Sequence, residues 1–426
     1  MKYQLDPKQT RLAGLSSVIG TTVEWYDFFI YGTMAALVFP KLFFPSDDPF
    51  VSLMLSFATF FVGFVARPLG AIFFGHFGDR IGRKTTLVIT ILLMGFSTFA
   101  IGFVPSYDQI GILAPIILVT LRVIQGFSIG GEWGGAVLLA MEWGETNKRG
   151  LMASLPQMGA PFGLVLSSAV TSLLIAISGD GFEIWGWRVV FGLSLILVLL
   201  GLFIRLNVME TPYFKEVLEK KDIPKLPVIE VFAKFPKEVV SGMLARVVSD
   251  IAFYIFITFV VSYGTSYLEL DDSVFINATL IGALFAGAAV PLFGYLSDRI
   301  GRNKIYRYGI IAVILWAFPY FALLNTKNVF LIFLSIILSL VIWSSMFATI
   351  SAIIAESFPS RIRYTGASVT FQLTGIIGGG LAPMIAIRLL QSFNTSAAVS
   401  LYLIAAAIIS IVALHFLKDH TGKNLD

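Results

Sequence analysis

The chain of 426 residues contains no cysteine and only three histidines. The absence of cysteine excludes disulfide bonds, cysteine-based metal sites and thiol catalysis, and three scattered histidines are a poor basis for a zinc site. A GxxxxGK[ST] phosphate-binding loop is also missing, so ATP hydrolysis is not expected. We therefore predict no metal, no cofactor and no enzyme built on cysteine, histidine or serine.

Charged residues are scarce as well, because they make up 13% of the chain whereas 57% is hydrophobic. A soluble domain usually has about a quarter of its residues charged. About 20 apolar residues in a helix span the hydrocarbon core of a bilayer, and runs of that length recur along this chain. Since these runs are too long and continuous for the strands of a barrel, we predict an all-α protein embedded in the lipid bilayer.

Twelve apolar runs are predicted to be transmembrane helices. They cover residues 13–39, 50–74, 86–104, 110–142, 153–178, 186–206, 240–267, 274–296, 305–325, 328–355, 364–391 and 395–417. The first run contains Glu24 and Asp27 and lacks a small-residue cleavage site, so it is predicted to be a retained helix rather than a signal peptide. The polar segment 207–238 is expected to be a linker with some amphipathic helix.

The basic residues, which give a formal net charge of +4, gather on one predicted side of the membrane. Most lie near the N-terminus, in four short loops, in the central linker and in the C-terminal tail. By the positive-inside rule, both termini and the linker are predicted to be cytoplasmic in a multi-pass protein of the cell membrane. The net charge therefore gives no reason to expect a nucleic-acid partner.

The two halves of the chain resemble each other. The string GHFGDRIGRK at 75–84 recurs as GYLSDRIGRNK at 294–304, and Glu142 with Arg149 is matched by Glu356 with Arg363. Repeated halves related by an axis along the membrane normal are one way in which transporters surround a midplane site. We predict an N-terminal six-helix bundle (1–206), a linker (207–238) and a C-terminal six-helix bundle (239–426), related by a pseudo-two-fold axis.

At these residues the chain resembles the major facilitator superfamily, in which the loop between helices 2 and 3 carries G-x-x-x-D-R-x-G-R-[RK]. Within it, the strings EWYDFFIYG at 24–32, RPLG at 67–70 and RVIQGFSIGGEWGG at 122–135 resemble the metabolite:proton symporters. That family includes carriers of shikimate, 2-oxoglutarate, citrate, and proline or betaine. The resemblance covers the whole chain and implies a secondary transporter.

Few charged side chains lie inside the apolar runs. An ionised group in the hydrocarbon costs about 3 kcal/mol or more, so each needs a partner or a hydrated cavity. Asp27 and Arg122 both lie near the middle of their runs and are predicted to pair. If a substrate carboxylate takes Arg122, then Asp27 can accept a proton, which is a symport mechanism. The alternative is a permanent structural ion pair.

The other intramembrane charges also have two interpretations. Arg67 and Arg246 could clamp an anionic substrate with their planar donors. Alternatively, Arg67 could pair with Glu132 or Glu24, and Arg246 could be neutralised by Asp250, four residues further along the same face. Glu132 could be a second proton site or a structural partner of Arg67. Glu24 could relay protons or simply pair with an arginine.

Several polar side chains are further candidates for the substrate site, next to the aromatic run of the first helix. An aromatic solute or a quaternary amine could stack there, although packing against lipid or other helices is the alternative for most of these rings. The candidates are Tyr26, Tyr31, Gln125, Tyr254 and Gln372.

The repeated loops are predicted to act as a gate rather than a binding site. Their aspartates can accept hydrogen bonds from helix N-termini and arginines only while the cytoplasmic side is closed, which biases a two-state equilibrium. The alternative is a basic loop that only sets topology. The predicted gate residues are Asp79, Arg80, Arg83, Glu142, Arg149, Asp298, Arg299, Arg302, Glu356 and Arg363.

Together these features predict a proton-coupled symporter that imports a small organic acid or zwitterion by alternating access. The expected partner is a carboxylate-bearing small molecule, and the expected functional unit is a monomer. A proton-linked exporter or exchanger of the same fold, or a facilitator without coupling, remains the alternative, because the direction of a reversible cycle follows the gradients.

Overall fold

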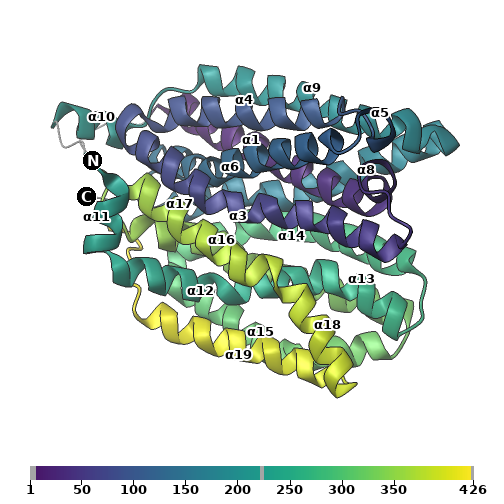
Figure 1. The fold of residues 1–426 in the computed structure, drawn as a ribbon. Coiled ribbons are helices and arrows are strands. Elements are labelled where there is room, and N and C mark those ends of the chain that lie inside the picture. The colour runs from purple at the N-terminus through teal and green to yellow at the C-terminus, as the bar shows by residue number, and fades with distance from the viewer. Residues whose placement is uncertain (1–5, 221–224, 424–426) are drawn as a thin grey trace.

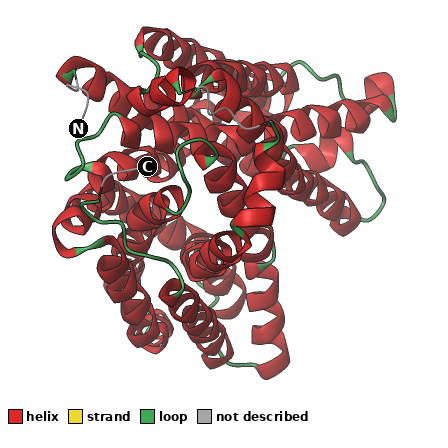
Figure 2. Ribbon diagram, turned by 90° about the vertical axis from the view of Figure 1, so that its left-hand side faces the viewer, coloured by secondary structure: helices red, strands yellow, loops and turns green. Residues whose placement is uncertain are grey.

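The computed structural model describes residues 6–220 and 225–423, and every regular element in this part of the chain is a helix (Figures 1 and 2). Residues 221–224 of the predicted linker, and the outermost residues of both predicted bundles, lie outside the described residues. The fold class predicted from composition is therefore confirmed for the described chain.

The first half contains six long helices. They are α1 (Pro7–Leu37), α3 (Pro49–Ile81), α4 (Arg83–Ile101), α6 (Leu113–Glu142), α8 (Gly159–Ser178) and α9 (Trp187–Asn207). Short helices lie between them at α2 (Phe39–Phe43), α5 (Tyr107–Ile110) and α7 (Arg149–Ser154). Helices α10 (Pro212–Glu219) and α11 (Pro227–Lys234) lie in the linker.

The second half repeats this arrangement. Its helices are α12 (Pro236–Tyr254), α13 (Val260–Ser262), α14 (Asp272–Ile300), α15 (Arg302–Asn325), α16 (Val329–Glu356), α17 (Arg363–Thr374), α18 (Ala382–Phe393) and α19 (Ala397–His415). The π-helical segment Ile255–Phe259 joins α12 to α13, a second one, Tyr263–Tyr267, continues α13, and a third, Gly375–Gly380, joins α17 to α18. Such π-helical turns are often found at functional sites.

Ten stretches of described helix are long and apolar enough to cross a membrane. The longest, 149–207, contains both α8 and α9, which meet at the turn around Gly179–Gly186 and therefore make two crossings. Helix α1 adds another, since its 31 residues exceed the length of a span even though Glu24 and Asp27 interrupt its apolar character. The count agrees with twelve spans.

The repeated loops share one backbone feature. Gly82, between α3 and α4, has φ 107°, and Gly301, between α14 and α15, has φ 113°. A residue with a side chain rarely adopts this conformation, so glycine allows each helix pair to reverse direction within one residue. The repeat in sequence therefore corresponds to a repeat in backbone geometry.

The two halves lie against each other as two groups of helices, purple to teal and teal to yellow in Figure 1. Helix α3 packs on α17, α8 packs on α14, and α7 packs on both α14 and α16. Both termini lie at the same end of the molecule as α10 and α11, which we call the terminal end (Figure 1). The interface between halves is therefore the place to look for the site.

Candidate functional site

At the terminal end, Asp79 of α3 caps a helix of the opposite half. Its two carboxylate oxygens accept hydrogen bonds from the backbone N–H of Tyr364 (3.1 Å) and from the N–H (2.9 Å) and hydroxyl (2.7 Å) of Thr365, in the first turn of α17. The first N–H groups of a helix have no partner within it and favour a negative charge. Asp79 therefore ties the two halves together.

Asp298 of α14 makes the equivalent contact in the reverse direction. It accepts hydrogen bonds from the backbone N–H of Gly150 (2.7 Å) and Leu151 (2.8 Å), in the first turn of α7. The expectation that both repeated aspartates meet helix N-termini is confirmed by these bonds.

Glu142, at the end of α6, lies between an arginine of each half. Arg83 of its own half approaches to 3.4 Å and Arg363 of the other half also to 3.4 Å. Arg83 additionally donates to the carbonyl of Ser360 across the interface, at 2.8 Å. All three charged side chains are buried, so their pairing compensates for the loss of hydration.

Glu356, at the end of α16, repeats the pattern with the halves exchanged. Arg302 of its own half lies at 2.9 Å and Arg149 of the other half at 3.6 Å. We call these contacts and those of Asp79, Asp298 and Glu142 the charged cluster. The predicted gate residues Arg80 and Arg299 lie outside it: both are exposed, Arg80 contacting His76 (3.2 Å) and Arg299 stacking on Tyr295.

The start of the linker also joins the charged cluster, which the sequence did not indicate. The Thr211 hydroxyl donates to Glu142 at 2.5 Å, and Glu210 accepts a hydrogen bond from the backbone N–H of Lys84 at 3.1 Å. Burial raises the pKa of Glu210 above its usual value. The linker is thus held to the loop that carries the first repeated motif.

An aromatic contact closes the interface one layer deeper. Trp133 of α6 stacks on Phe371 of α17 with ring centroids 3.4 Å apart, and the guanidinium of Arg246 of α12 lies 3.2 Å from the centre of the same Phe371 ring. The Tyr364 hydroxyl donates to the carbonyl of Gly131 at 2.7 Å. These contacts and the charged cluster close the terminal end.

Removal of both cluster glutamates is expected to open the terminal end. In a Glu142→Gln/Glu356→Gln variant, four arginine contacts lose their charged acceptor, so the population open at this end rises several-fold. Because the chain has no cysteine, spin labels can be placed at Glu145→Cys and Lys304→Cys alone, and their distance distribution measures the change. Glu183→Gln, which removes the Lys41 ion pair at the opposite end, is the control. An unchanged distribution in the double variant would contradict a gating role.

Asp27 and Arg122 are connected, although not by the direct ion pair that we predicted. Arg122 donates to Gln125 (2.5 Å), the amide of Gln125 donates to the hydroxyl of Thr98 (2.8 Å), and that hydroxyl donates to Asp27 Oδ2 (2.6 Å). Oδ1 of Asp27 is buried without a hydrogen-bond partner. The hydrogen-bond chain passes from α6 through α4 to α1. Gln125 and Thr98, which were not part of the predicted pair, therefore connect Arg122 to Asp27.

Arg67 of α3 does not pair with Glu132, contrary to one interpretation of the sequence. Its guanidinium lies over the rings of Phe28 (5.0 Å) and Phe64 (4.6 Å). It forms no ion pair within 4 Å among the described residues, and Oε2 of Glu24 is buried without a hydrogen-bond partner. The predicted Arg67–Glu24 ion pair is therefore also not formed.

Glu132 pairs instead with Arg205 of α9. Arg205 donates to both carboxylate oxygens, the longer bond being 3.1 Å, and the hydroxyl of Thr90 donates to Glu132 at 2.7 Å. Arg205 also donates to the carbonyl of Leu87 at 2.8 Å. Because the sequence placed Arg205 at the edge of the linker, its role as the partner of Glu132 was missed.

Loss of the Glu132 charge is expected to destabilise the protein. Glu132→Gln leaves Arg205 buried without a counter-charge, which costs about 3 kcal/mol. Removing both charges in Glu132→Gln/Arg205→Gln should recover part of this loss. Unfolding in detergent, followed by circular dichroism, measures both variants. If Glu132→Gln unfolded like the parent and abolished only proton coupling, Glu132 would be a proton site instead.

Arg246 and Asp250 form the ion pair that was one interpretation of their spacing. Their side chains approach to 2.8 Å along α12. Arg246 also donates to the backbone carbonyl of Phe371. Arg246 is thus neutralised and joined to the aromatic contact.

The predicted polar lining is divided between packing and the interface. Tyr26 is fully buried and donates to the carbonyl of Val190 (2.9 Å), so it packs inside the first half and does not line the interface. Tyr31 lies beneath the Arg122 guanidinium at 4.0 Å, and Tyr254 is partly exposed with its ring 6.4 Å from that of Phe64. Gln372 is buried on α17 and makes no side-chain hydrogen bond with described residues.

Two buried arginines stand apart from the others by their lack of an acidic partner. Within the described chain, Arg67 and Arg122 have no carboxylate within 4 Å, whereas Arg205 and Arg246 each have one. Both unpaired guanidinium groups lie on rings of the first half, which stabilise a cation only weakly compared with a carboxylate. These two guanidinium groups therefore carry positive charge that no described carboxylate neutralises within 4 Å.

Two repeated helical bundles that meet around buried charges are an arrangement found in membrane transporters of the secondary-carrier class. Comparison with known proteins agrees. The model of the Major Facilitator Superfamily matches residues 17–383 and 242–425. The shikimate transporter of Escherichia coli K12 is 39% identical over 97% of this chain and 96% of its own length, and the proline/betaine transporter of the same strain is 34% identical over 99% and 86%.

Among solved structures, the proton:xylose symporter XylE bound to 6-bromo-6-deoxy-D-glucose superposes with a TM-score of 0.80 over 98% of both chains, at 16% identity. This likeness shows the fold. The chain belongs to the Major Facilitator Superfamily. It is a multi-pass membrane transporter and not an enzyme.

Proposed function

We propose that this protein carries a small organic acid or zwitterion across the membrane together with a proton, by alternating access between its halves. The observation that carries the proposal is the hydrogen-bond chain from Arg122 to Oδ2 of Asp27, whose other carboxylate oxygen, Oδ1, is buried without a hydrogen-bond partner. One end of this chain can bind an anion and the other can bind a proton. The two events are therefore linked through Gln125 and Thr98.

Arg122 and Arg67 bind the substrate carboxylate in this proposal. The planar guanidinium group offers paired donors that match a carboxylate, and a charged substrate supplies the negative charge that the described side chains do not. When the carboxylate takes the donor of Arg122 that now bonds Gln125, the hydrogen-bond chain is broken. Asp27 then has less stabilisation as an anion and binds the transported proton.

Glu24 is the second candidate for proton coupling. It is buried on the same face of α1 as Asp27 and also has a carboxylate oxygen without a hydrogen-bond partner. The polar groups Tyr31, Gln125, Tyr254 and Gln372 complete the proposed substrate site. The protein acts as a monomer, because both faces of the site come from one chain, and the terminal end with both termini faces the cytoplasm.

The relatives support this class of substrate, because one is named a shikimate transporter and another a proline/betaine transporter. An exporter or exchanger would use the same residues under opposite gradients. A facilitator without coupling would make no use of the link to Asp27.

The test is uptake into proteoliposomes under an imposed inward proton gradient, with shikimate, 2-oxoglutarate, citrate, aromatic acids and betaine as candidate substrates. At least one should be concentrated inside, and the accumulation should collapse when a protonophore removes the gradient. If a substrate equilibrates without being concentrated, the protein is a facilitator. If none of these substrates moves, the proposed substrate class is wrong.

A further inference from the structure

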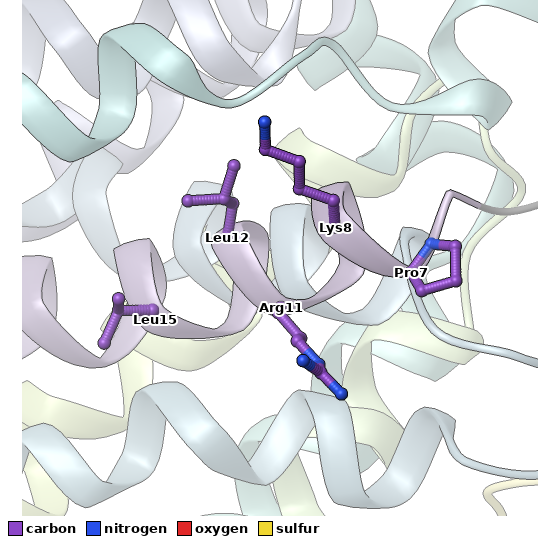
Figure 3. A pocket seen from close by; sticks show the side chains of 5 residues that line it. All are labelled: Pro7, Lys8, Arg11, Leu12 and Leu15. Atoms are coloured by element: carbon purple, nitrogen blue, oxygen red, sulfur yellow. The ribbon is translucent and has the colours of Figure 1, made fainter.

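The outer face of α1 has a hollow of about 420 Å³ at the terminal end (Figure 3). Its lining comes from the first three turns of the helix. It consists of Pro7, Lys8, Arg11, Leu12 and Leu15. Lys8 and Arg11 are three residues apart and therefore start from the same face of the helix, although their ends point in different directions in Figure 3, and the two leucines lie further along the helix. None of these five residues belongs to the proposed substrate site.

The basic side chains of this hollow are free to bind an anion. Lys8 and Arg11 are both exposed, and neither forms an ion pair with the described residues. Leu15 is 50% exposed, so its apolar surface also lacks a protein partner. The surface that lines the hollow is mostly apolar, and the exposed ends of Lys8 and Arg11 add positive charge beside it.

This order of side chains matches the order of chemistry through one leaflet of a bilayer. Helix α1 starts at Pro7 and rises 1.5 Å per residue, so Arg11 lies about 6 Å and Leu15 about 12 Å along it. A phospholipid changes from anionic phosphate to acyl chain over a similar depth. Contact with a free phosphate buries no apolar surface of a leucine, whereas contact with an acyl chain does and is therefore favourable.

The backbone that carries the hollow is held firmly from the other side of the helix. Asp6 caps α1 by accepting from the N–H of Lys8 (2.9 Å). The Thr10 hydroxyl donates to the carbonyl of Trp143 (2.9 Å), and Gln9 accepts from the N–H of Met209 (2.8 Å). These contacts hold the inward face of the helix against α6 and the linker, so the backbone from which Lys8 and Arg11 extend is fixed in place.

We propose that this hollow binds an anionic phospholipid, with its phosphate between Lys8 and Arg11 and an acyl chain along Leu12 and Leu15. Its volume lies in the range of sites that hold small ligands. The anionic lipids of a cytoplasmic leaflet supply the matching charge. The proposal does not depend on the identity of the transported substrate or on proton coupling.

The test is native mass spectrometry of the purified full chain titrated with dioleoyl phosphatidylglycerol, with dioleoyl phosphatidylcholine in parallel. The parent should bind one phosphatidylglycerol more tightly than the rest, and Lys8→Ala/Arg11→Ala should weaken that binding about thirtyfold, from about 1 kcal/mol per basic side chain. Glycerol 3-phosphate should compete poorly. Equal competition by glycerol 3-phosphate would mean a free-anion site and would overturn the assignment to lipid.

The chain offers a matched control in Lys304→Ala/Arg307→Ala. These two residues are also exposed, three apart and in the first turns of a helix, α15, but they are not among the residues that line the hollow on α1. Only the α1 double variant should lose the tight lipid. Equal losses in both would show general surface attraction and would refute a defined site. If the alanine variant does not fold, two other variants provide the test. Lys8→Arg/Arg11→Lys preserves the charge and should keep the binding of phosphatidylglycerol. Leu15→Ser removes only apolar surface and should weaken that binding.

Discussion

Asp27→Asn is expected to abolish accumulation of substrate while leaving exchange across the membrane intact. Asparagine keeps the shape of Asp27 and can still accept the hydrogen bond from Thr98 at its amide oxygen. It cannot gain or lose a proton, so the gradient has no group to act on. For one proton per substrate, a gradient of one pH unit supports about tenfold accumulation in the parent, because one pH unit is worth about 1.36 kcal/mol. In the variant this ratio should fall to about one.

The measurement is paired: net uptake under a pH gradient, and exchange of labelled for unlabelled substrate at equal pH on both sides. Glu24→Gln is the informative comparison, because Glu24 is also buried on α1 and carries the same kind of group. Asp47→Asn, on the exposed loop before α3, controls for the change in net charge. Accumulation that survives in Asp27→Asn but fails in Glu24→Gln would move the proton site to Glu24.

Arg67→Lys is expected to weaken substrate binding about thirtyfold, seen as a rise in the half-saturating concentration. Lysine keeps the charge but loses the planar pair of donors and the flat surface that lies over Phe28 and Phe64. A charge-assisted hydrogen bond is worth about 1.5–3 kcal/mol, which sets the expected size of the effect. The maximal rate should change less than the half-saturating concentration.

Arg188→Lys is the control for Arg67→Lys. Arg188 donates to the backbone carbonyls of Gly102 and Val104, away from the interface, and should leave substrate affinity unchanged. Binding of substrate to the purified protein, measured by tryptophan fluorescence or calorimetry, separates affinity from turnover. Unchanged affinity in Arg67→Lys would remove Arg67 from the substrate site and leave Arg122 as the anion-binding residue.

The terminal end shows how far the repeat in sequence could lead. The two copies of the motif predicted that Asp79 and Asp298 meet helix N-termini, and both do. The same symmetry relates two ion pairs between the halves, that of Arg363 with Glu142 and that of Arg149 with Glu356. A repeat relates equivalent positions, so contacts made twice could be anticipated from either copy. Among the described residues, the hydrogen bond from Thr211 to Glu142 has no counterpart at Glu356, and it was found only in the structure.

Amino-acid sequence alone determined the membrane class, the spans, the two halves and the short set of charged residues within the hydrocarbon, because each follows from composition and order along the chain. Tertiary structure decided how those charges are paired. Glu132 meets Arg205 rather than Arg67, and Asp27 reaches Arg122 only through Thr98 and Gln125. Pairing between helices depends on the rotation and depth of each helix against its neighbours, which hydropathy does not encode. For that reason the two arginines left without a carboxylate could be identified only after the helices were packed.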